Sequence, residues 1–197
     1  MIGGARALLQ PDGQQPLAAT RLDGAAAQTL LDVASAQLLA GNLPAARQLV
    51  DRALKSSEYT QFVVQNEPWQ ARQGVSYQLI VAYTLMNTGA AQAGGVQLGN
   101  LSRLLDRLIH AGLERHEIYD LQAEVAAARG DLDGAMRSLG HAMELGTFNA
   151  WRAEHEPYLR PLKGRSDYRA LIQRISEQND RARKKIAAAE AAAASRI

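Results

Sequence analysis

The chain has 197 residues, which is enough for one well-buried domain, and its low aromatic content of 5% with abundant alanine favours helices over strands. The absence of cysteine excludes disulfides and thiolate metal sites without fixing the redox compartment. The net charge is only +2, and no apolar run approaches the length that crosses a bilayer, so we expect no membrane span.

Residues 1–22 are rich in glycine and proline, which indicates an irregular N-terminal segment. Within it, Arg6–Pro11 loosely resembles the end of a helix of a repeated unit followed by its proline. A second interpretation is therefore that this segment is a linker remnant and that the chain was cut from a longer protein.

A first pair of antiparallel helices is predicted at about residues 27–60. Its small residues, which let two helices approach closely, are Ala34, Gly41, Ala46 and Ala53. Larger apolar residues supply the buried faces between these positions. Asn42 and Pro44 are expected to open the second helix.

The segment from Ser57 to Gly74 lies outside this pattern and is expected to form a long connection with a short helix. Trp69 is interpreted as a cover over the edge of the helices, and stacking on a ligand is the alternative.

Residues 75–112 only partly repeat the first pattern. Residues 75–88 predict a helix that has Ala82 at its small position and that Gly89 ends. Ala90–Gly95 is small and contains glycine, and the next strong helical pattern is Leu98–Ala111. We therefore expect an irregular unit whose second helix is lengthened or displaced.

Residues 116–149 predict another regular helix pair. Its small residues are Ala123, Gly130, Ala135 and Ala142, at the spacing of the first pair. Gly130 is expected to close the first helix and Asp131 to cap the second, so that Ala123 faces Ala135 across the turn.

This shared spacing resembles that of the tetratricopeptide repeat, a helix-turn-helix family. The resemblance implies an all-α fold in which antiparallel helix pairs form a right-handed superhelix over residues 23–149. An ordinary antiparallel helix pair is the alternative, because alanine-rich helices are common. A scaffold of this kind offers a binding surface rather than a reaction.

Residues 150–197 are expected to cap the last repeat and to end in a C-terminal helix. The residues expected to cover the repeat are Trp151, Tyr158, Leu159 and Leu162. A helix from about Ser166 then carries a stripe of Tyr168, Leu171, Ile172 and Ile175. Beyond this stripe, Ala187–Ala194 should project or fray because it offers little apolar surface.

The order of Trp151, the stretch Pro157–Leu162 and a terminal helix resembles the closing segment of repeat regions in bacterial, chiefly proteobacterial, multidomain proteins. There the repeats accompany winged-helix regulators, nucleotide cyclases, kinases or sulfatase-like enzymes. The resemblance implies an accessory or regulatory module and does not name its companion. Lys163–Asp167 departs from the family's usual short connection.

No pattern for catalysis, a metal or a cofactor is found in the sequence. The four histidines, at positions 110, 116, 141 and 155, show no pairing at the spacing of metal ligands on a helix. The glycines form neither a Walker loop nor a dinucleotide fingerprint. We therefore expect no enzyme activity, no catalytic residue, no metal site and no cofactor.

The resemblance also implies a partner-binding inner face, lined by the first helix of each repeat. The residues that it places on this face are Leu31, Ser35, Leu38, Leu39, Leu79, Tyr83, Met86, Asn87, Glu117, Asp120 and Glu124. This face grades from apolar to acidic, so we expect a protein or peptide segment with apolar anchors followed by a basic stretch. The alternative is that the leucines of residues 31–39 are covered by a preceding repeat or by the N-terminal segment.

Residues 152–185 contain ten Lys or Arg against five Asp or Glu. Nucleic acid is one possible ligand of its last part, which contains Arg174, Arg181, Arg183, Lys184 and Lys185. No aromatic residue interleaves with these five residues, so we favour a solvated helix face. The expected function is a non-catalytic protein-interaction scaffold. The alternatives are a self-associating module, which forms a homo-oligomer through the alanine-rich C-terminal helix, and a basic adaptor for nucleic acid. The compartment, bacterial cytoplasm or periplasm, stays open.

Overall fold

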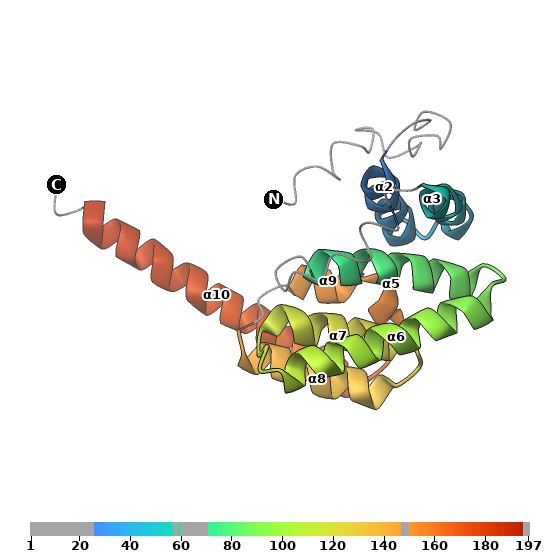
Figure 1. Cartoon of the computed structure of the whole chain (residues 1–197). Coiled ribbons are helices and arrows are strands. Elements are labelled where there is room, and N and C mark those ends of the chain that lie inside the picture. Colours follow the sequence, from blue (N-terminus) through green and yellow to red (C-terminus); the bar gives the residue numbers. More distant parts are fainter. Residues whose placement is uncertain (1–25, 57–58, 60–70, 147–149, 195–197) are drawn as a thin grey trace. The chain divides into compact units, whose positions relative to one another are not determined.

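The computed structural model describes residues 26–56, 59, 71–146 and 150–194 (Figure 1). Every regular element within these ranges is helical, which confirms the all-α prediction. None of the described helices combines the length and hydrophobicity needed to cross a membrane. The chain divides into two compact units, Met1–Leu113 and Glu114–Ile197, and each is considered by itself. The predictions for residues 1–22 and for Trp69 lie outside the described residues.

The described residues of the first unit form two helix hairpins. Its helices are α2 (Ala27–Leu39), α3 (Leu43–Lys55), α5 (Ala71–Asn87) and α6 (Ala91–His110). Helix α2 packs on α3, α5 packs on α6, and α5 also contacts both helices of the first hairpin. The Tyr77 hydroxyl donates a hydrogen bond of 2.8 Å to Asp32, which links α5 to α2. Because α5 begins at Ala71, the predicted connection up to Gly74 is shorter than expected.

The predicted turn residues end and begin the helices as expected. Gly41, Gly89 and Gly130 follow α2, α5 and α7 (His116–Ala128) with φ angles of 78°, 87° and 84°, a region that favours glycine. The side chains of Asn42 and Asp131 each accept a hydrogen bond from the backbone N–H three residues later. These sequence predictions are confirmed.

The helix pair predicted to be irregular, at residues 75–112, has its small residues at the same spacing as the other two pairs. Helix α6 starts at Ala91 and includes residues 91–95, so the expected start of the second helix at Leu98 is wrong. Ala82 and Gly94 are 12 residues apart, as are Ala34 and Ala46 in the first pair. A Cβ at Gly94 would lie 2.5 Å from the Ala82 carbonyl oxygen, so only glycine fits this crossing. The second helix is lengthened rather than displaced, with 20 residues against 13 in α3.

The second unit is a helix hairpin covered by its C-terminal segment. It contains α7, α8 (Leu132–Glu144), α9 (Ala150–His155), the 3₁₀ helix η2 (Pro157–Leu162) and α10 (Ser166–Ala194). Helices α7 and α8 pack together, η2 contacts α7, and α10 contacts α8 and α9.

The core of the second unit includes the predicted stripe of α10. Its buried residues are Ala123, Ala127, Ala135, Leu139, Met143, Ala153, Leu159, Leu162, Tyr168, Leu171, Ile172 and Ile175. Trp151 is absent from this set, and its expected covering role is wrong: the residue is 60% exposed, and its ring stacks on His155 at 4.6 Å. The six residues of α9 turn Ala153 inward and leave the indole on the solvent side.

The C-terminal half of α10 is largely exposed. From Ser176 to Ala191 every side chain is exposed except that of Asn179, which is half-buried. Figure 1 shows this half extending away from α7 and α8. The helix nevertheless continues to Ala194, with ion pairs between residues 177 and 181 and between residues 180 and 183. The prediction that the helix projects beyond its apolar stripe is confirmed.

Candidate functional site

The predicted partner-binding residues of the first unit divide into core and surface. Leu31, Leu38 and Leu79 are at most 2% exposed, so their side chains are part of the core and do not face a partner. Packed helices bury their large apolar residues against each other. The leucines expected on the partner-binding face therefore lie in the core of the unit. The remaining five are partly or fully exposed: Ser35, Leu39, Tyr83, Met86 and Asn87.

We call these five residues the α2–α5 surface. They lie on two helices that contact each other, and Leu39 is 39% exposed. The amide of Asn87 donates a hydrogen bond of 2.8 Å to the Tyr83 carbonyl oxygen, so that side chain is held along the helix end. The surface carries no charged side chain and combines apolar with neutral polar groups. It therefore suits an apolar protein segment better than a charged one.

The predicted acidic face of α7 is not formed as expected. Glu117 and Asp120 are half-exposed, but Glu124 is only 2% exposed. One oxygen of its carboxylate lies 2.8 Å from the Arg152 guanidinium of α9. Glu124 is therefore wrong as an accessible partner-binding residue, because the helical period turns it toward α9 rather than toward solvent.

Glu124 belongs to a cluster in which the guanidinium of Arg152 lies close to two acids, Glu124 and Glu156. Arg152 lies 3.5 Å from Glu156. Asp120, Glu124 and Arg152 border one small pocket of about 20 Å³. The second oxygen of Glu124 has no hydrogen-bond partner within the described chain. Burial raises the pKa of Glu124 to about 8 although Arg152 opposes this, and burial also raises the pKa of Glu156. The cluster joins α9 to α7.

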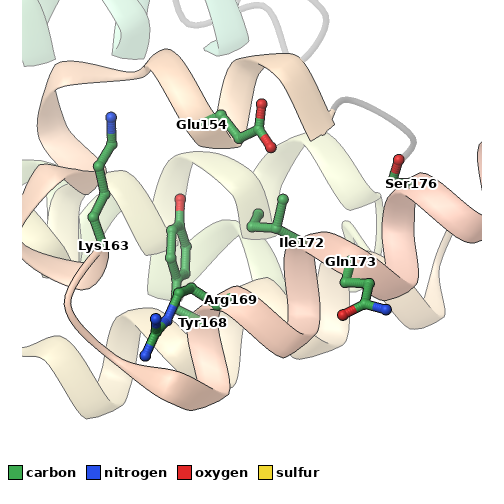
Figure 2. Close-up of a pocket in the computed structure, with 7 residues that line it drawn as sticks. All are labelled: Glu154, Lys163, Tyr168, Arg169, Ile172, Gln173 and Ser176. Atoms are coloured by element: carbon green, nitrogen blue, oxygen red, sulfur yellow. The ribbon is translucent and has the colours of Figure 1, made fainter.

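An open groove of about 490 Å³ runs along α9, the turn after η2 and the first half of α10 (Figure 2). We call it the α9–α10 groove. Glu154 borders it from α9, and Lys163 borders it from the turn. Helix α10 contributes Tyr168, Arg169, Ile172, Gln173 and Ser176.

The groove has an apolar base and charged edges. Tyr168 and Ile172 are both less than 9% exposed, and the Tyr168 hydroxyl donates a hydrogen bond of 2.5 Å to the Ala153 carbonyl oxygen. Burial raises the pKa of Tyr168 to about 12, so the phenol stays protonated and fixed. Lys163 and Arg169 are exposed, and neither has an ion pair with any described residue. The arrangement suits reversible binding of an anionic group.

Sequence reasoning missed this groove because no single segment contains it. Tyr168 and Ile172 were predicted only as core, and the cations at its edge were counted only within a basic stretch. One signal was available: Arg169 has no acid three or four residues away on either side, unlike Arg181 with Glu177. No group of three His, Asp or Glu residues in the described ranges is placed to hold a metal ion.

No family model matches the chain, and neither a curated protein nor a solved structure matches it. The α2–α5 surface and the α9–α10 groove are therefore assigned on geometry and chemistry alone.

Proposed function

We propose that the chain is a non-catalytic helical scaffold of the tetratricopeptide-repeat type that binds a segment of another protein. The observation that carries the proposal is the common register of three helix hairpins. A close pair of small residues 12 positions apart recurs as Ala34 with Ala46, Ala82 with Gly94, and Ala123 with Ala135. Such repetition supports a repeat array, in which each hairpin packs mainly on its neighbours.

Packing within the first unit supports the same proposal. Helix α5 contacts both helices of the preceding hairpin, which is how stacked helix pairs bury a continuous core. Arg47 of α3 also donates a hydrogen bond of 3.1 Å to the Thr88 carbonyl oxygen, which joins the turn between α5 and α6 to the first hairpin. Together with the likeness of the C-terminal segment, this favours an accessory or regulatory module of a larger bacterial protein.

The α2–α5 surface is our proposed site for the partner. Leu39, Tyr83 and Met86 can supply apolar contact area, and methionine adapts its shape to a bound chain. Glu124 is buried and does not extend this surface with an accessible acid. We therefore propose a partner segment with apolar anchors and without a basic stretch beside them.

A peptide-display selection against the purified chain tests the proposal. The affinity of a selected peptide is then measured for Tyr83→Ala with Met86→Ala and for a control, Leu54→Ala with Val96→Ala, which removes exposed apolar side chains elsewhere. We expect a loss of at least about tenfold in the first variant and less than about twofold in the control. Circular dichroism must show that both variants stay folded. A selection that yields no binding peptide would contradict the scaffold function.

Self-association through α10 is the second candidate, because its C-terminal half is helical while its side chains are exposed. Light scattering on the chain with and without residues 178–197 tests it, and a change from dimer to monomer on deletion would favour it. A nucleic-acid adaptor has less support, since Arg181 and Arg183 already pair with acids of the same helix.

A further inference from the structure

We infer that the α9–α10 groove is a second binding site and that its ligand is an acidic segment of a partner protein. The inference rests on the proposed function in one respect, since the ligand is again a protein segment. It differs in place and in chemistry, because the α2–α5 surface carries no charged side chain while the groove is bordered by cations.

The base of the groove is preformed and can accept an apolar side chain. Its volume of about 490 Å³ falls in the range of sites that hold small ligands or a few side chains. Tyr168 is fixed by its hydrogen bond to Ala153, and Ile172 lies beside it in the core. A ligand would therefore meet a rigid wall and would not need to order these side chains, which lowers the entropic cost of binding.

The cations at the groove are free to receive carboxylates, whereas neighbouring arginines are not. Arg165 lies 2.7 Å from Asp133 and 2.8 Å from Asp167, so its guanidinium is already satisfied. Lys163 and Arg169 have no such pair among the described residues. Figure 2 shows both near Tyr168, at one end of the groove. Two unpaired cations beside an apolar base match a segment that carries acidic and apolar residues.

Glu154 favours a peptide over a nucleic acid as the ligand. Its carboxylate borders the groove from α9 and has no ion pair with a described residue. A phosphate backbone, which is uniformly negative, would be repelled there. A peptide presents backbone N–H donors as well as carboxylates, so it can satisfy Glu154 while its acids contact Lys163 and Arg169.

The experiment uses the full chain and a labelled ten-residue peptide of glutamate, leucine and serine, with a second peptide in which lysine replaces every glutamate. Fluorescence anisotropy measures affinity, and NMR of the ¹⁵N-labelled chain locates the site. We expect binding of the acidic peptide alone, with shifts confined to α9, the turn after η2 and the first half of α10. Equal binding of the lysine peptide, stronger binding of duplex DNA, or shifts elsewhere would overturn the inference.

Charge reversal of the two groove cations has a matched control at Lys184 and Lys185 of α10. Lys163→Glu with Arg169→Glu should weaken binding by about tenfold, because both carboxylate contacts become repulsive. Lys184→Glu with Lys185→Glu makes the same change in net charge on the exposed half of α10 and should weaken binding by less than about twofold, through screened long-range attraction. Equal losses in the two variants would show nonspecific attraction and would refute a site in the groove.

The two proposals fail in distinguishable ways. If the acidic peptide does not bind but display-selected peptides still bind the α2–α5 surface, the groove inference is wrong and the scaffold function stands. If neither kind of peptide binds, both are wrong.

Discussion

Gly94 and Gly95 are adjacent on α6 and lie in opposite environments. A Cβ at Gly94 would meet backbone atoms of α5, at 2.5 Å from the Ala82 carbonyl oxygen and 2.6 Å from the Met86 nitrogen. A Cβ at Gly95 would meet nothing within 4 Å. The absence of a side chain is therefore required by packing at the first position, while at the second it only lowers the helix propensity.

This contrast gives a prediction with an internal control. Gly94→Ala should lower the free energy of unfolding by roughly 1 to 3 kcal/mol, because the two helices must separate to admit the methyl group. Gly95→Ala should raise it by about 0.5 to 1 kcal/mol, because alanine restricts the unfolded chain and favours the helix. Urea denaturation measures both. Stabilisation by both substitutions would mean that α5 and α6 do not approach closely at Gly94.

Glu124 provides a second prediction at the residue scale, on the pH dependence of stability. Its pKa is about 8 in the folded chain against an ordinary value of 4.5, so the folded state binds this proton more tightly than the unfolded state does. Its contribution to stability is thus fully present below pH 4.5 and is lost as the pH rises through about 8. Arg152, Glu156 and Asp120 surround the carboxylate, and Glu156 acts with the same sign.

Glu124→Gln should therefore flatten the decline in the free energy of unfolding between pH 5 and pH 8. The control Glu177→Gln changes an exposed acid of α10 and should leave the decline as it is. Unfolding curves in urea at several pH values give the comparison. A wild-type stability that does not fall across this window would indicate that Glu124 remains ionised throughout, as a full ion pair with Arg152.

At the scale of elements, α10 has two parts that differ in packing. Leu171 and Ile175 are 6% and 2% exposed and belong to the core of the second unit, whereas the exposed half after Ile175 is helical through its own sequence. Alanine has the best helix propensity, and the ion pairs within this half add a few tenths of a kcal/mol each.

Leu171→Ala with Ile175→Ala should lower the free energy of unfolding by about 4 to 8 kcal/mol, since each substitution opens a cavity in the core. The side chains of residues 187–191 are all exposed, so deletion from Ala187 onward should leave the melting temperature unchanged. Amide hydrogen exchange should find strong protection around Leu171 and little beyond Ile186. Equal protection along the whole helix would point to a tail packed on another molecule.

At the scale of the whole molecule, each of the two units has its own packed helices. The second unit encloses a core from α7, α8, α9, η2 and α10, all of which lie after residue 113. We predict that a fragment of residues 114–197 folds alone, because every residue of this core belongs to the fragment. Circular dichroism and a cooperative thermal transition test this. A fragment without a cooperative transition would show that the second unit depends on the first.

The sequence by itself determined the features that depend on near neighbours along the chain. The helical periods, the glycines with positive φ, the caps at Asn42 and Asp131, and the buried stripe of α10 each follow from residues a few positions apart. Hydrogen bonds and side-chain neighbours within a helix join residues three or four positions apart, so these features can be predicted without a structure.

The tertiary structure decided the features in which distant segments meet. The backbone of α5 makes glycine necessary at position 94. The guanidinium of Arg152, 28 residues after Glu124, makes that acid part of a buried ion pair. The α9–α10 groove has the same origin, since α9 and α10 must pack together before Lys163 and Arg169 border a common space. Burial and charge pairing depend on distance in space, and the separation of residues along the chain does not determine that distance.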